Sequence, residues 1–180
     1  FYVGSDTRND PDRVRVHHDH SFLIRPYASP KSSGVSKVAF SVNNHAGFET
    51  GGSAPGVGDT HFLGSAIAGR VWLARDYVGL TARFEVLDHP GGYSAQFPPP
   101  GFDPSQGFKL WGFTQSVEVM PKDFLSLRAE VMYRSASVPF FAGPGGTTSI
   151  DGFQDTVDPA FVPDVSKHQT LFTVSAIVRL

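Results

Sequence analysis

Hydrophobic and polar residues alternate along most of this chain, and most clearly in residues 108–134. Two alternating runs flank the short turn-forming tetrapeptide at 120–123. A period of two is the signature of a β-strand with one apolar and one polar face. Both runs exceed the usual strand of roughly 5–6 residues, and a strand needs roughly 9–11 tilted residues to cross a bilayer. The pattern therefore predicts a transmembrane β-hairpin.

Further segments of the chain alternate in the same way, and a short apolar piece opens it. They lie at residues 14–27, 37–49, 61–75, 78–88 and 168–180, with the opening piece at 1–4. No segment shows the 3.6-residue period of a helix. We therefore expect an all-β fold of about eight antiparallel up-and-down strands, in a single domain over residues 1–180.

The connections between the predicted strands tend to alternate between long and short. The long ones are residues 50–60, 89–106 and 135–167, the short ones are 76–77 and 120–123, and 28–36 is intermediate. Transmembrane β-barrels of bacteria combine long outer loops with short periplasmic turns. The rhythm predicts such a barrel in the outer membrane, with the long loops outside and the C-terminus in the periplasm.

Composition narrows the functions that this chain can have. Lysine plus arginine is 15 and aspartate plus glutamate is 17, so nothing in the charge favours nucleic acid as a partner. Without cysteine there is neither a disulfide nor a thiolate site. The chain contains no apolar run of 18 or more residues, so no transmembrane helix is predicted. No signal peptide is recognisable. The start at Phe1 reads like the end of a strand, so we expect a mature or N-terminally truncated piece of a larger barrel.

Two features favour lipid on the apolar side of the strands and water on the polar side. Single strands carry both signs of charge on the polar face, as in the pairs Arg83 with Glu85 and Arg128 with Glu130, which suits a lumen where neighbours can pair. Aromatic residues lie near strand ends, as in the girdles of membrane barrels. The polar face predicts these lumen-lining residues: Arg15, Asp19, Arg25, Asn43, His45, Glu49, Arg70, Arg83, Glu85, Glu118, Arg128, Glu130, Arg134 and Arg179.

Three stretches of the chain resemble a known family. They are residues 6–17, residues 138–146 after a strand ending in Tyr133 and Arg134, and the turn at 120–123 followed by Phe124, Arg128 and Glu130. These stretches are similar to segments of the OmpL-like β-barrel porins of bacterial outer membranes, and the likeness extends from Gly4 to Leu180. The resemblance implies an integral outer-membrane barrel that passes solutes, of which this chain would be the C-terminal portion.

No catalytic or cofactor site is expected. The run His17-His18-Asp19-His20 contains metal-ligand side chains, but a strand turns His17 and Asp19 to one face and the others to the opposite face. Asp151, Asp155, Asp158 and Asp164 do not have the spacing of a known calcium loop. Neither a nucleophile motif nor a nucleotide fingerprint occurs. We therefore predict no metal, no cofactor and no enzymatic activity.

The last long loop is unusually aromatic for a solvated segment. We expect it to fold onto the barrel mouth and narrow it, with the constriction formed by Pro139, Phe140, Phe141, Gly143, Pro144, Phe153 and Phe161.

The predicted function is passive diffusion of small hydrophilic solutes through a charged lumen with slight anion preference. The expected partners are outer-membrane lipid and those solutes, and association with other envelope proteins or with further copies of the chain stays open. Alternatives are a closed structural or partner-binding barrel and a soluble β-barrel that binds an apolar ligand.

Overall fold

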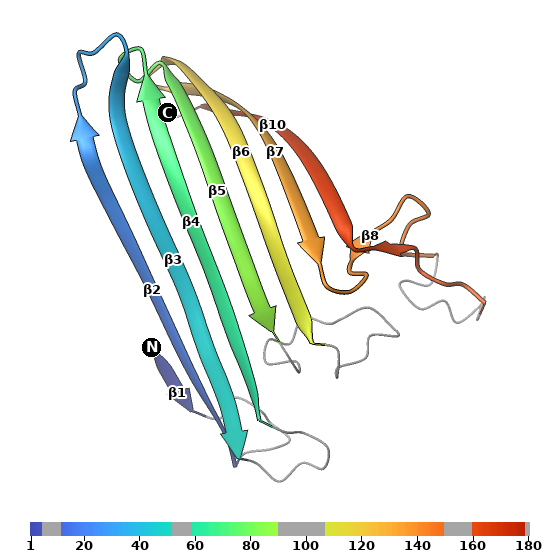
Figure 1. The fold of residues 1–180 in the computed structure, drawn as a ribbon. Helices are drawn as coiled ribbons and strands as arrows, with labels where there is room; N and C mark the ends of the chain where they lie inside the picture. Colours follow the sequence, from blue (N-terminus) through green and yellow to red (C-terminus); the bar gives the residue numbers. More distant parts are fainter. Residues whose placement is uncertain (5–11, 52–58, 90–106, 150–159, 179–180) are drawn as a thin grey trace.

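The computed structural model describes residues 1–4, 12–51, 59–89, 107–149 and 160–178, and these build one large antiparallel sheet. Its strands follow the order β1-β2-β3-β4-β5-β6-β7-β10, so consecutive strands are neighbours except where the chain leaves β7 (Figure 1). Their bounds are β1 (Tyr2–Gly4), β2 (Arg13–Ala28), β3 (Val35–Gly51), β4 (Thr60–Leu73), β5 (Val78–His89), β6 (Phe108–Lys122), β7 (Leu125–Ala136) and β10 (His168–Val178). The predicted all-β class and the eight antiparallel strands are confirmed.

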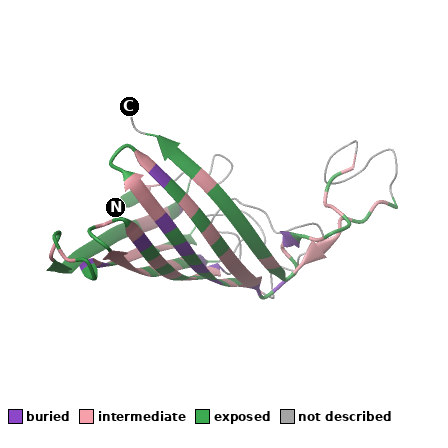
Figure 2. Ribbon diagram, turned by 90° about the horizontal axis from the view of Figure 1, so that it is seen from above, coloured by how far each residue is buried: buried purple, intermediate pink, exposed green. Residues whose placement is uncertain are grey.

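The sheet is strongly curved and open (Figure 2). Strands β1 and β10 form its two edges and do not pair with each other in the described part of the chain. The predicted barrel closure is therefore not present among these residues. No helix of the described segments is long and apolar enough to cross a membrane.

The turn between β6 and β7 is shorter than the alternation suggests. The sequence places it at residues 120–123, but β6 continues to Lys122, which pairs with Leu125 across a two-residue turn. The register shifts between Val119 and Lys122. A bulge of this kind tolerates Pro121, because proline has no N–H to give to the ladder.

The turn between β4 and β5 is longer than predicted. The sequence extends the strand to Arg75, whereas β4 ends at Leu73 and Ala74, Arg75 and Asp76 have positive φ angles of 51°, 59° and 70°. Non-glycine residues are uncommon in this left-handed region. The neighbouring hairpin holds them there, because the Ala74 and Arg75 N–H groups donate to the carbonyls of Gly34 and Ser32 at 2.9 and 3.0 Å.

A small second sheet lies within the predicted last loop. Strands β8 (Phe141–Ala142) and β9 (Val165–Ser166) pair antiparallel, next to the ends of β7 and β10 in Figure 1. Phe140 packs between Phe108 at 4.8 Å and Phe141 at 5.4 Å, measured between ring centroids. Two-residue strands are too short to show a period, so the sequence predicts only a loop there.

Candidate functional site

The register of the sheet gathers most of the predicted lumen residues on one face, which we call the inner face. Directly opposite pairs on it include Arg15 with Glu49, Asp19 with His45, and Glu118 with Arg128. By the same registers the inner face also carries Asn43, Arg70, Arg83, Glu85, Glu130 and Arg134. Arg25 lies in the irregular pairing between Ile24 and Tyr27, and Arg179 is outside the described residues.

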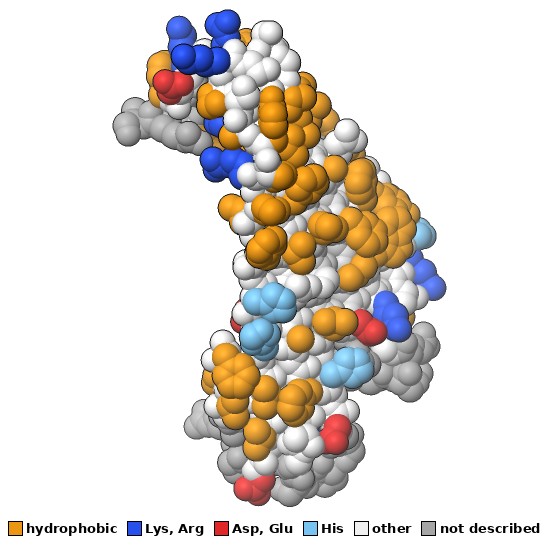
Figure 3. Space-filling view, turned by 60° about the vertical axis from the view of Figure 1, so that its left-hand side comes forward, with side chains coloured by type: hydrophobic (Ala, Val, Ile, Leu, Met, Phe, Trp, Pro, Cys, Tyr) orange, Lys and Arg blue, Asp and Glu red, His pale blue; other side chains and the backbone are white. Residues whose placement is uncertain are grey.

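The opposite, outer face is apolar and exposed. Phe22, Ile67 and Phe172 are 59%, 53% and 73% exposed, and other large hydrophobic side chains along the strands resemble them. Figure 3 shows hydrophobic side chains spread over the sheet, with histidines between an upper and a lower group. Such a surface far exceeds the scattered apolar residues of a soluble protein and needs a lipid or protein covering.

Polar side chains fill the inner face instead of a hydrophobic core. Arg13, Ser116 and Glu118 are 3%, 3% and 9% exposed. Among the described residues the buried hydrophobic side chains are Ala39, Ala136, Val138 and Phe141. The curvature of the sheet crowds side chains on its concave side, so the less exposed inner face is the concave one (Figure 2). The distribution is the reverse of a water-soluble barrel, in which the apolar side chains point inward.

Glycines on the inner face let charged side chains meet over an intervening strand. Gly79 of β5 pairs with Trp72 of β4 and with Glu118 of β6, and the Arg70 guanidinium crosses over it to bond the Glu118 carboxylate. A Cβ atom on Gly79 would lie 2.6 Å from Arg70 Nη2. The missing side chain is therefore what leaves room for this ion pair.

A second glycine, in the next strand, also lies beneath an ion pair between its two neighbouring strands. Gly112 of β6 lies between Glu85 of β5 and Arg134 of β7, and Arg134 Nε donates to Glu85 Oε1 at 3.2 Å. A Cβ on Gly112 would lie 2.8 Å from Glu85 Oε1. Both bridges thus pass over glycines that the alternation alone marks only as small polar-face positions.

Arg13 is a charged inner-face residue that the sequence analysis missed. Its Nε donates to the Glu49 carboxylate at 3.2 Å, and Arg15 bonds the same carboxylate from the next inner position of β2. The strand predicted from the sequence begins at Val14, so Arg13 falls just outside it. Arg13 lies two residues before Arg15, so in an extended strand both side chains point to the same face, and this spacing could have identified Arg13 as an inner-face residue.

The middle of the inner face holds an arginine-lined hollow of about 370 Å³. Arg83, Arg128 and Thr114 line it, and their atoms Nε, Nε and Oγ1 are buried without a hydrogen-bond partner among the described protein atoms. Buried donors are normally satisfied by protein or by ordered water. The hollow therefore offers polar groups suited to water or to a polar solute.

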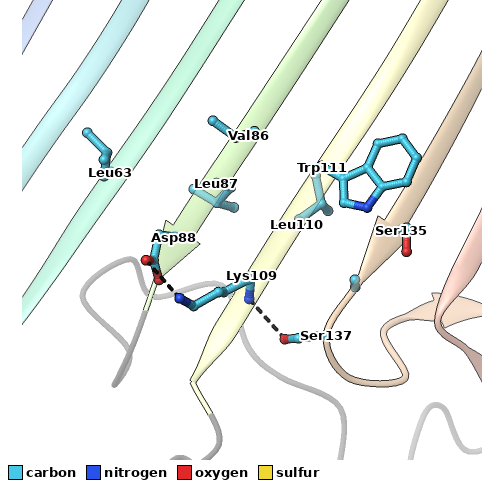
Figure 4. Close-up of a pocket in the computed structure, with 10 residues that line it drawn as sticks. Leu63, Val86, Leu87, Asp88, Lys109, Leu110, Trp111, Ser135 and Ser137 are labelled. Carbon is cyan, nitrogen blue, oxygen red and sulfur yellow. Dashed lines mark hydrogen bonds and ion pairs between the residues drawn. The ribbon is translucent and has the colours of Figure 1, made fainter.

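Polar groups lie at the edge of the outer face, at the ends of β5 and β6 next to the long connection between these strands. There Lys109 Nζ lies 3.4 Å from Asp88 Oδ2, beside Val86 and Trp111, and the Lys109 N–H donates to the Ser137 hydroxyl at 3.0 Å (Figure 4). Trp111 also packs on Tyr133, with 5.4 Å between ring centroids. An aromatic row next to an ion pair matches the interfacial girdle of a membrane barrel.

The predicted constriction residues are only partly described. Phe140 packs on Phe108 at the start of β6 and on Phe141 of β8, and the Gly143 N–H donates to the Asp164 carbonyl at 2.9 Å. Pro139, Pro144 and Phe161 belong to the same described segments, whereas Phe153 lies outside them. The constriction itself stays a prediction. Of the aspartates considered for calcium, Asp151, Asp155 and Asp158 are outside the described residues, and the Asp164 carboxylate accepts from the Gly145 N–H at 2.7 Å.

Comparison with known proteins supplies the family. Searches of curated proteins and of solved structures gave no match. A family model matches residues 1–180, the whole chain, and its description is putative beta-barrel porin-2, OmpL-like. Porin families are generally non-enzymatic, and membership implies the outer membrane. The chain therefore belongs to the OmpL-like β-barrel porin family, in agreement with the resemblance seen in its sequence.

Proposed function

We propose that this chain contributes to an outer-membrane channel through which small hydrophilic solutes diffuse passively along the inner face. The observation that carries the proposal is the reversed distribution of side chains, with exposed apolar residues outside and partly enclosed charges inside. Lipid would cover the outer face, and water and solutes would occupy the inner one. The long connections would lie outside the cell and the short turns in the periplasm.

The inner-face charges favour anions slightly. Arginines outnumber the carboxylates there. Arg83 and Arg128 pair through Nη2 with the carboxylates of Glu85 and Glu130, and their buried Nε atoms border the hollow without a hydrogen-bond partner among the described protein atoms. Arginines that line a pore raise the local concentration of anions. We therefore add a slight anion preference to the proposed channel function.

Conductance in planar bilayers tests the channel. The full-length protein, folded in detergent as judged by heat-modifiable gel migration, should give discrete conductance steps, and its reversal potential in a salt gradient should have the sign of anion preference. Combining Arg83→Gln with Arg128→Gln should reduce that preference. Lys109→Gln removes a cation from the outer face and should leave it unchanged.

Three outcomes would contradict the proposal. Folded protein that inserts without conductance would favour the closed structural barrel, and a cation-selective reversal potential would remove the anion preference. Failure to partition with detergent would favour a soluble barrel.

A further inference from the structure

Three potential metal ligands converge on the inner face, away from the arginine-lined hollow. Asp19 of β2 lies directly opposite His45 of β3, and His17 lies two residues from Asp19 on the same face of β2. One nitrogen of each histidine and one oxygen of Asp19 all lie within 4.8 Å of one another. The sequence alone counts only two ligands, because a single strand supplies no more. The register of β3 adds the third.

The three side chains already point at one another. His17 Nε2 lies 2.7 Å from Asp19 Oδ1, and His45 Nδ1 bonds the same oxygen. The His17 ring also stacks on Phe62 of β4, with 6.0 Å between centroids and 25° between planes. Gly47 pairs with His17 on one side and with Phe62 on the other, so the strand between the two rings has no side chain at this position.

We propose that His17, Asp19 and His45 bind a divalent transition-metal ion of the Zn²⁺ class. Zinc accepts two imidazoles and a carboxylate at about 2.0–2.2 Å in tetrahedral geometry, which places ligand atoms about 3.3 Å apart. The present separations reach this arrangement if each ligand moves by less than about an ångström. Two imidazoles disfavour Ca²⁺ and Mg²⁺, which take oxygen ligands.

The cluster is open to solution. The side chains of His17, Asp19 and His45 are 27%, 48% and 53% exposed, so an ion can enter and water can take the fourth position. The next inner-face charges along the strands are Arg13 and Arg15, which both bond the Glu49 carboxylate.

Calorimetric titration of Zn²⁺ into the full-length protein in detergent tests the site. We expect one ion per chain for the wild type, and at least about tenfold weaker binding for His45→Ala and for Asp19→Asn. His20→Ala is the matched control, because His20 belongs to the same run but bonds Asn44 on the outer face. Heat-modifiable migration verifies that each variant is folded.

Three results of the titration would overturn the proposed metal site. Absence of Zn²⁺ binding, undiminished binding by folded His45→Ala, or loss of binding in His20→Ala would each overturn the proposal. In the first case the histidines would only orient a hydrogen-bonded carboxylate. Because no conductance is measured, failure here leaves the proposed channel untouched.

Discussion

At the scale of single residues, two glycines on the inner face leave space for ion pairs between strands. Gly79 and Gly112 each lie beneath an ion pair that joins the strands on either side. Any side chain there competes for the space of a guanidinium or a carboxylate. Both partners of each ion pair are partly enclosed. Separating them therefore costs more free energy than separating an exposed ion pair, because partly buried charges are left without counterions.

We expect Gly79→Val to destabilise the folded protein by about 1–3 kcal/mol, the usual cost of overpacking. The valine methyl groups would displace the Arg70 guanidinium from Glu118. Urea unfolding in detergent measures the effect. Ala129→Val adds similar volume on the exposed outer face of β7 and should change stability little. An equal loss in both variants would show that the bridge is not the cause.

The Asp76 carboxylate stabilises the turn between β4 and β5. The Lys37 ammonium and the Ser36 hydroxyl bond it and hold the pKa of Asp76 below its ordinary value of 3.8. A carboxylate with a lowered folded pKa contributes stability above its unfolded pKa, and that contribution is lost as the pH falls through the folded value. Stability should therefore fall when the pH drops below about 4.

Asp76→Asn should make the unfolding midpoint less dependent on pH in that range and lower it at neutral pH. Urea midpoints measured between pH 2 and 7 would show both effects. Asp123→Asn removes a carboxylate from the other short turn, where no ion pair is found among the described residues, and serves as control. A pH profile of Asp76→Asn that is identical to the wild type would contradict this role.

At the scale of strands, alternation predicts more than any other sequence feature. It gives the eight strands and the two faces, since the period of two is fixed by the pleat. It does not give the strand ends, which depend on turns. The three consecutive positive φ angles after Leu73 occur where Ala74 and Arg75 bond the neighbouring hairpin. The bulge near Pro121 falls where alternation still predicts a turn. Nor does it show which residues meet across strands, so the approach of His45 to His17 was not foreseeable.

Neighbouring residues of β10 test the assignment of faces. Val174 lies on the outer face opposite Ala129, and Thr173 lies on the inner face opposite Glu130. In lipid vesicles Val174→Arg should cost about 2–4 kcal/mol of unfolding free energy if the site is near the bilayer midplane. Thr173→Arg should cost much less, because the inner face is polar and the Glu130 carboxylate, already bonded to Arg128, lies directly opposite. Equal costs would contradict a lipid-facing outer side.

At the scale of the whole molecule, the open sheet and the aromatic loop bear on how wide a pore would be. The Phe140 ring packs on Phe108, so the segment after β7 is attached to the strand ends. Deleting residues 139–162 should raise single-channel conductance if this loop narrows the mouth. Replacing the same residues with a flexible Gly/Ser segment of equal length controls for loop closure. Unchanged conductance in both variants would exclude a constriction.

The glycine-spanned bridges also bear on the order of folding. Arg70 with Glu118 and Arg134 with Glu85 both connect the β4–β5 hairpin to the β6–β7 hairpin, and neither lies within one hairpin. Contacts close in sequence form earlier than distant ones, so each hairpin should form before its bridges. Interactions that form after the transition state act on the unfolding rate. Gly79→Val should therefore accelerate unfolding while leaving the rate of hairpin formation almost unchanged.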